Sequence, residues 1–274
     1  MADIVAFQPR LPAGAPNSGV LPAATPNTHL ENGLYAAVMV VPVHNEAGEI
    51  AEFLRQWHRE IPDMPLILVF DRCTDNSLEV AQKAADGILA AQAASTMPDV
   101  PVCLHMEVLR FNPLGKSGAC LCGLWAALRR NVGGNIPVIF WDADNEYALN
   151  RGFIDSVVHW VLHNGGLASG IRSGRKLWKS RWALAATRLT LRCFTRKPPP
   201  ADVLTGVHAL PLGHVLFAMN GARTFDMETR LVHYALKQGL PHWEGEVAYF
   251  PRTEGKKIRA YHLFGILLAA CGFR

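Results

Sequence analysis

Two aspartates, Asp142 and Asp144, stand one residue apart directly after the apolar run Val138–Trp141. In an extended segment their side chains point to the same side, and in a turn both can still reach one cation. Carboxylate oxygens are the ligands that Mg²⁺ and Mn²⁺ prefer. An Asp-x-Asp pair is a weak signal by itself, because aspartate is common in turns and at helix N-termini. Its meaning depends on the elements that position it.

The run before Asp142 is one of four apolar segments that the pattern predicts to be strands. Each of the first three leads through a polar loop into a segment with helical spacing. The predicted strands are Val38–Val43, the "PLILVFD" segment, roughly residues 101–109, and Val138–Trp141. Such alternation predicts an α/β domain with a mainly parallel central sheet and helices on both faces. Ligands of these sheets bind at the carboxyl ends of the strands, where Asp142 and Asp144 fall.

The composition sets limits on the kind of protein. The chain has 274 residues, half of them hydrophobic, with 27 Lys and Arg against 23 Asp and Glu. This small excess predicts anionic ligands in places and no nucleic-acid partner. The six cysteines lack the spacing of a zinc site or a disulfide scaffold, which favours reduced thiols and a cytoplasmic location. Residues 1–33 are rich in Pro, Ala, Gly and Asn, and we expect them to be disordered.

Two common nucleotide-binding patterns are incomplete. The loop after the first strand, "PVHNEAGEI", has one glycine and no GxGxxG, which disfavours a Rossmann enzyme. The segment "NPLGKSGAC" ends like a P-loop but lacks its first glycine, so a loop whose glycines allow tight backbone geometry is the simpler interpretation.

The ordered blocks of the chain resemble the family-2 glycosyltransferases of the GT-A fold. Among these they are most similar to the polyprenyl-phosphate sugar synthases typified by dolichyl-phosphate mannose synthase. The blocks are "VVPVHNE", "LVFDRCTDNS", "NPLGKSGACLCGLWAA", "WDADNE", "ASGIRSGR", "ADVLTGVHAL", "FDMETRLVHYALKQG" and "EVAYFPRTEGKKIRA". The resemblance runs from about Ala37 to Arg259 and implies a GT-A domain over residues 34–260. The residues after it, 261–274, form an apolar C-terminal segment. His44 and Phe70 depart from the usual family residues.

The resemblance also implies site residues. Asp142, Asp144 and Glu146 would hold Mg²⁺ or Mn²⁺, although Glu146 is equally placed to cap the next helix. The implied donor-binding residues are Pro42, His44, Glu46, Val69, Asp71, Asp142, Ala143, Arg172, Arg252 and Lys257. Asp71 has an independent reason, because a carboxylate at a strand end can accept hydrogen bonds from a base or a ribose.

Basic residues would compensate the phosphate charge. Arg172 and Arg252 match basic family positions, and guanidinium suits bidentate phosphate binding. Arg252 is also an implied catalytic residue, with Asp142 and Asp144. The last block departs from the family pattern, so Lys256, Lys257 and Arg259 all stay open as the final cation.

The predicted reaction is a metal-dependent, inverting transfer of a sugar from a nucleoside-diphosphate sugar. Asp144 is followed by no Glu-Asp pair of the kind that supplies a base for a neutral hydroxyl, which favours an already ionised polyprenyl phosphate as acceptor. Asp202, Asp226 and Glu228 stay open as bases, so the alternative is a soluble transferase acting on a hydroxyl of a small molecule or glycan. A third hypothesis is an inactive sugar-nucleotide-binding or membrane-scaffold protein.

Residues 172–197 mix nine Lys and Arg with tryptophans, leucines and a phenylalanine. This pattern suits either an amphipathic helix on an anionic bilayer or an ordinary helix packed on the sheet. The apolar residues 261–273 are too short to span a membrane and could lie at its surface. We therefore expect peripheral contact with the cytoplasmic membrane face.

Overall fold

A computed structural model describes residues 37–93, 104–109, 115–129, 135–174, 181–222, 225–250 and 260–273, with two short strands at 29–30 and 34–35. The strands are β1 His29–Leu30, β2 Leu34–Tyr35, β3 Val38–Val43, β4 Leu66–Asp71, β5 Leu104–Leu109, β6 Pro137–Phe140, β7 Leu167–Gly174, β8 His208–Pro211 and β9 His242–Tyr249. The helices are α1 Ile50–Glu60, α2 Ser77–Ala93, α3 Gly115–Arg129, α4 Arg151–Asn164, α5 Arg181–Thr195, α6 Leu212–Ala218, α7 Met227–Gln238 and α8 Ala260–Ala270.

Seven strands form one sheet in the order β5-β4-β3-β6-β8-β7-β9. Strands β5, β4, β3 and β6 are parallel, β8 is antiparallel to both β6 and β7, and β9 is parallel to β7. Within this sheet β8 alone is reversed, so the predicted mainly parallel sheet is confirmed. The strand that precedes Asp142, β6, is the central one.

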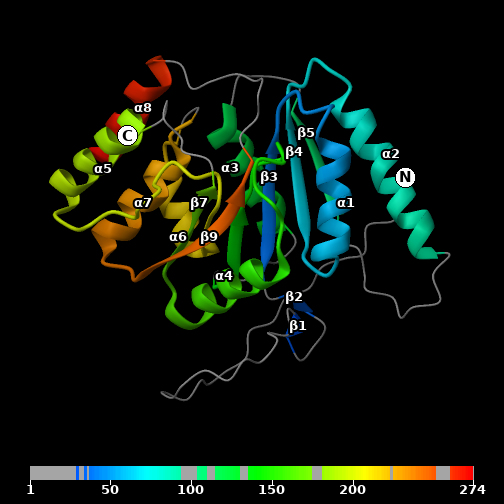
Figure 1. Ribbon diagram of the computed structural model, residues 1–274, viewed down its shortest axis with the longest axis horizontal. Coiled ribbons are helices and arrows are strands. Elements are labelled where there is room, and N and C mark those ends of the chain that lie inside the picture. The colour runs from blue at the N-terminus through cyan, green and yellow to red at the C-terminus, as the bar shows by residue number, and fades with distance from the viewer. Residues whose placement is uncertain are drawn as a thin grey trace.

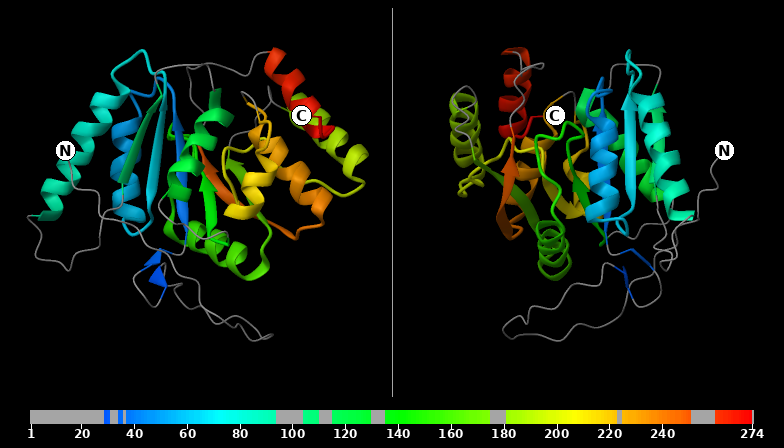
Figure 2. Two further views of the ribbon diagram at one scale, coloured as in Figure 1. Left: turned by 180° about the vertical axis from the view of Figure 1, so that it is seen from behind. Right: turned by 45° about the vertical axis from the view of Figure 1, so that its right-hand side comes forward.

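Helices cover both faces of the sheet because its strands are apolar on both sides. Val38 and Val40 of β3 belong to the core under α3, α6 and α7, whereas Met39 and Val41 belong to the core under α1, α2 and α4. Figure 1 shows α1 and α2 toward one end of the sheet and α5, α7 and α8 toward the other, and the views in Figure 2 agree.

Helix α3 lies unusually close to the sheet at Gly123. A Cβ at this position would overlap Val40 Cγ1 and lie 3.2 Å from Val69 Cγ2. The missing side chain lets the helix backbone approach β3 and β4.

Short strands lie near the N-terminus and a helix lies near the C-terminus. His29–Leu30, inside the predicted disordered tail, pairs with Leu34–Tyr35, and the intervening sequence includes Asn-Gly, a pair that favours hairpin turns. The rest of 1–33 lies outside the described residues. The predicted C-terminal segment forms α8, which packs on α5 and α7 as part of the helical layer.

The basic segment 172–197 is not one helix. Its first residues, Arg172–Gly174, belong to β7, residues 175–180 lie outside the described part, and α5 begins at Arg181. Arg172 pairs with Val247 in the β7–β9 ladder, which explains why this end is a strand. None of the described helices is both long enough and apolar enough to cross a bilayer.

Candidate active site

The carboxyl ends of β3, β4 and β6 meet at one edge of the sheet, and polar residues follow each of them. Asp142 lies two residues after Phe140, the last residue of β6, and its side chain lies on the α3 side. His44 follows β3, and Asp71 ends β4, whose residues are paired with β3 up to Val43 and Phe70. The fold therefore brings together predicted residues that are up to 100 positions apart.

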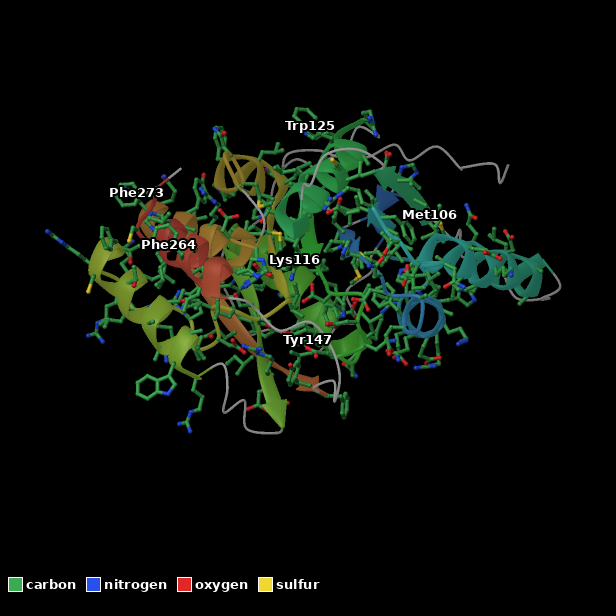
Figure 3. The ribbon with its side chains drawn as sticks, turned by 90° about the horizontal axis from the view of Figure 1, so that it is seen from above. Met106, Lys116, Trp125, Tyr147, Phe264 and Phe273 are labelled. Atoms are coloured by element: carbon green, nitrogen blue, oxygen red, sulfur yellow. The ribbon has the colours of Figure 1, made fainter. Side chains whose placement is uncertain are left out.

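A buried lysine stands at the centre of this edge. Lys116 Nζ lies 2.6 Å from Asp142 Oδ1 and 2.6 Å from Glu228 Oε1, and all three side chains are mostly buried. Figure 3 looks down on this region and shows Lys116 near the middle of the molecule. Burial would lower the pKa of Lys116, but the two carboxylates raise it well above its ordinary value. The ammonium group therefore stays charged and links α3, the loop after β6 and α7.

The missing side chain of Gly206 makes room for Asp142. A Cβ at this position would overlap Asp142 Oδ2 and lie 3.1 Å from the Tyr147 ring. The Gly206 amide donates a 2.8 Å hydrogen bond to the Tyr147 hydroxyl oxygen. The "TGV" turn before β8 therefore packs against Asp142 Oδ2, while Lys116 pairs with Asp142 Oδ1.

The loops after β3 and β4 are tied together. His44 Nδ1 lies 2.7 Å from the Asp71 carbonyl oxygen, the Glu46 amide donates to Ser77 Oγ at 2.8 Å, and the Thr74 amide donates to Asn45 Oδ1 at 2.7 Å. These contacts connect the two loops beside the strand ends.

Two predicted nucleotide contacts have side chains that are already engaged. The Asp71 carboxylate is nearly buried and pairs with Arg72 Nε at 3.0 Å. Val69 is fully buried and packs against Gly123 of α3, so its side chain faces the core. Pro42 is partly buried beside Val69, to which it is paired in the sheet. Of the predicted nucleotide contacts on β3, β4 and their loops, His44 is the exposed one.

The three carboxylates predicted to hold a metal are not brought together as a metal site. Asp142 forms an ion pair with Lys116, whereas Glu146 Oε2 accepts a 2.8 Å hydrogen bond from the Tyr249 hydroxyl of β9. Asp144 Oδ1 accepts from the Glu146 amide at 3.2 Å. Among the described residues no group of three or more His, Cys, Asp or Glu is placed to hold an ion.

The carboxylates of Asp142 and Asp144 still fit a weaker kind of metal site. Mg²⁺ and similar ions often take only one or two carboxylates from a protein and complete their shell with water and substrate phosphates. Asp144 is partly exposed and Ala143 between them is buried. The donor set therefore suits an ion that arrives with a diphosphate.

Arg172 is paired inside the protein. Its Nε and Nη2 donate to the two Asp202 oxygens at 2.6 and 2.7 Å, and its guanidinium lies 5.5 Å from the centre of the Tyr249 ring. Burial opposes the charge, but the hydrogen bonds to Asp202 raise the pKa of Arg172 further. A phosphate at Arg172 would have to share it with Asp202. Arg252, Lys256, Lys257 and Arg259 lie outside the described residues.

Sequence reasoning gave Lys116 no role, although it lies in a quoted block, and it left Glu228 among three open bases. Lys116 could have been identified from its position, because it lies in the first turn of a helix that follows a strand. Glu228, in the first turn of α7, is identified only by the fold, because 112 positions separate it from Lys116.

His208 of β8 lies buried beside the same cluster. Its Nδ1 is 2.9 Å from Ser169 Oγ, and its Nε2 has no hydrogen-bond partner among the described residues. Burial lowers the pKa of His208 to about 4, so the imidazole is neutral near pH 7. A neutral ring here adds no second positive charge next to Lys116.

Comparison with known proteins identifies the fold. No protein-family model matches the sequence, and no curated protein sequence does either. Solved structures of glucosyl-3-phosphoglycerate synthase from Mycobacterium tuberculosis are similar over 87% of this chain. The complex with UDP is 18% identical, with 80% of that chain covered and a TM-score of 0.55. The complex with Mn²⁺, UDP and phosphoglyceric acid is 17% identical, with 79% covered and a TM-score of 0.58.

A third complex of that synthase, with Mn²⁺, UDP-glucose and glycerol 3-phosphate, is 18% identical over 87% of this chain and 80% of that one, with a TM-score of 0.51. At these identities the likeness shows the fold. It confirms the predicted GT-A fold for this chain.

Proposed function

We propose that the protein is a glycosyltransferase that moves a sugar from a nucleoside-diphosphate sugar to a small phosphorylated acceptor. The observation that carries the proposal is the position of Asp142, which the central strand of a GT-A sheet delivers to the ligand edge beside Lys116 and Glu228. Support comes from the similar synthase, which was solved with UDP and with UDP-glucose. UDP is therefore the first nucleotide to test.

The choice of acceptor follows the predicted alternative. The similar synthase was solved with phosphoglyceric acid and with glycerol 3-phosphate, and both are small phosphorylated molecules. These comparisons favour such an acceptor over polyprenyl phosphate. Such a reaction needs a carboxylate as general base, because a hydroxyl acceptor must lose its proton.

The donor would lie across the ends of β3, β4 and β6. His44, Glu46 and Asp71 would border the base and ribose, and the backbone at Ala143 would lie next to the diphosphate. Pro42 and Val69 would shape the floor of this site through their positions in the sheet. Arg172, Arg252 and Lys257 are proposed as further phosphate contacts.

A divalent cation fits between the protein and the donor diphosphate. Asp142 and Asp144 would hold it, with Glu146 as a further candidate, and when bound it supplies positive charge to the leaving diphosphate. The similar synthase was solved with Mn²⁺ and with Mg²⁺.

The side chains around Asp142 have complementary tasks in transfer. As the acceptor oxygen bonds to the anomeric carbon, the bond to the diphosphate breaks and negative charge grows on the leaving oxygen. We propose that Lys116, which its two carboxylate partners keep charged, compensates this charge. We propose that the Glu228 carboxylate, which pairs with Lys116 at 2.6 Å, accepts the proton of the acceptor hydroxyl.

Transfer of radiolabelled glucose from UDP-glucose tests the proposal, with glycerol 3-phosphate, 3-phosphoglycerate and extracted polyprenyl phosphate as separate acceptors and Mn²⁺ present. We expect an anionic product that stays in the aqueous phase. Label that partitions only into organic solvent would instead support the lipid-phosphate acceptor. Absence of transfer from any nucleotide sugar would refute the activity. The configuration of the product, read by NMR, tests the predicted inversion.

A matched pair of variants tests the role of Glu228. Glu228→Gln should lower kcat roughly 100-fold, the usual size of a general-base contribution. Glu79→Gln makes the same change on the exposed face of α2 and should leave kcat unaltered. Equal kcat for Glu228→Gln and wild type would exclude Glu228 as the base.

A further inference from the structure

Helices α5 and α8 pack against each other at the outer flank of the helical layer. Figure 1 and both views of Figure 2 show them side by side, beyond α7. Their inner sides are buried through Leu191 of α5 and through Ile266 and Ala270 of α8. Their outer sides form what we call the α5–α8 face.

Large apolar side chains stand on the α5–α8 face, exposed to solvent. Trp182 is 84% exposed and Leu189 is 64% exposed, and their spacing of seven residues places both on one side of α5. Phe264 of α8 is 66% exposed and Phe273, just after α8, is 60% exposed. Figure 3 shows Phe264 and Phe273 on the same flank of the molecule. Proteins seldom leave several such side chains together in water without a binding partner.

The charge of the face is entirely positive. Residues 181–197 and 260–273 contain five Lys and Arg and no Asp or Glu. Four of these cations, Arg188, Arg192, Arg196 and Lys197, form no ion pair within the described part of the chain, and all four are exposed. Arginines seven and four residues apart, at 181, 188 and 192, run along α5 beside the apolar side chains.

We propose that the α5–α8 face binds the surface of an anionic lipid bilayer. Tryptophan and phenylalanine favour the boundary between headgroups and acyl chains, and nearby arginines attract anionic headgroups. Docking of a second copy through the same face would be opposed, because a two-fold contact places the unpaired cations of both copies together. The positive charge therefore favours the bilayer over self-association.

This proposal is independent of the proposed sugar transfer. The face lies on α5 and α8, whereas Lys116 and Asp142 belong to α3 and the end of β6. Binding to vesicles can be measured without nucleotide, sugar or metal. A failure of either proposal therefore leaves the other unaffected.

Co-sedimentation of the full chain with vesicles provides the test. Vesicles of phosphatidylcholine mixed with phosphatidylglycerol should bind the protein about tenfold or more tightly than vesicles of phosphatidylcholine alone. The affinity for the mixed vesicles should fall as salt is raised. No binding to either vesicle, or equal binding to both, would overturn the proposal.

A pair of tryptophan variants locates the binding surface. Trp182→Ser should weaken binding to the mixed vesicles roughly tenfold, because the side chain that enters the interface is lost. Trp125→Ser makes the same change at a 59% exposed tryptophan of α3, which Figure 3 shows apart from Phe264, and should not weaken binding. Circular dichroism checks that both variants are folded.

Two further results would contradict bilayer binding by the α5–α8 face. Equal weakening by Trp182→Ser and Trp125→Ser would show that binding is not located on α5 and α8. Light scattering is the second readout. The bilayer proposal is wrong if wild type is a dimer, does not bind vesicles, and becomes a monomer on Trp182→Ser. The α5–α8 face would then bind a second copy of the chain.

Discussion

Lys116 and Arg192 are both cations on helices of the same side of the sheet, yet their surroundings are opposite. Lys116 is buried and contacts two carboxylates at 2.6 Å. Arg192 is exposed on a helix that has no acidic residue. A charge removed from water must be paired within the protein, because the cost of desolvation is otherwise several kcal/mol. A charge left in water needs no internal partner and remains available for an external one.

The different surroundings of Lys116 and Arg192 predict different effects of substitution on stability and on binding. Removal of a side chain from the Lys116 cluster should affect folding and catalysis together. Removal of a side chain from the α5–α8 face should affect only what the protein binds.

The largest effect is expected for Lys116→Met, which leaves Asp142 and Glu228 without their cation. We expect the free energy of unfolding to fall by about 3–5 kcal/mol, the usual cost of breaking a buried ion pair from one side. Urea denaturation measures this change. Lys83→Met, which removes the exposed partner of Glu79, is the control and should show no measurable change. Equal stability of Lys116→Met and wild type would mean that the cluster is not what holds α3 to β6.

The next effect is expected for Gly206→Ala. The new Cβ would overlap Asp142 Oδ2, so Asp142 or the turn must move, at a cost of about 1–3 kcal/mol and with loss of transfer activity. Gly87→Ala is the matched control, since nothing lies within 4 Å of its Cβ in α2. It should raise stability by up to about 1 kcal/mol. The opposite signs can be read from the two midpoints of urea unfolding.

A pH-dependent effect is expected from His208. Its pKa is about 4 in the folded protein, below the ordinary value of 6.5, so between these values the unfolded chain binds a proton that the folded one does not. Stability should be unaffected above pH 6.5 and should fall as pH drops toward 4, by up to roughly 3 kcal/mol from this group.

His208→Gln should remove this part of the acid sensitivity. The measurement is the difference in unfolding free energy between wild type and variant at several pH values from 7.5 to about 4.5. His163→Gln, at an exposed position of α4, controls for the loss of a histidine. A difference that stays constant over this range would contradict the role of burial at His208.

The smallest effect is expected for Arg192→Gln on α5. The unfolding free energy should stay within about 0.5 kcal/mol of wild type, because the side chain is exposed and unpaired in the described structure. Transfer activity should also be unchanged. A clear loss of stability would mean that Arg192 has an internal partner, and the contrast with Lys116 would fail.

Local patterns predicted the half of the domain that consists of β3 to β6. Val38–Val43 was predicted with its exact bounds, because a continuous apolar run between polar loops is characteristic of a strand buried on both faces. The same reasoning placed Asp142 at a strand end. Each of these features depends on neighbours in sequence.

The other half depends on contacts between distant segments. Arginine is a residue type that binds phosphate, but only the fold shows that the Arg172 guanidinium already forms an ion pair with Asp202. Glu146 follows Asp144 like a third metal ligand, yet Tyr249 holds it from β9. The meeting of Lys116 with Glu228 depends on how α7 packs next to α3. No periodicity of the sequence encodes these pairings.

The most direct measurement is the affinity for UDP, by calorimetry, with and without Mn²⁺ in wild type and Asp142→Asn. We predict that Mn²⁺ tightens UDP binding by about tenfold or more in wild type, which is about 1.4 kcal/mol, and that Asp142→Asn loses this dependence. Asp86→Asn, on the exposed side of α2, should behave like wild type. UDP binding with the same Mn²⁺ dependence in Asp142→Asn, or no UDP binding by wild type, would contradict the proposed site.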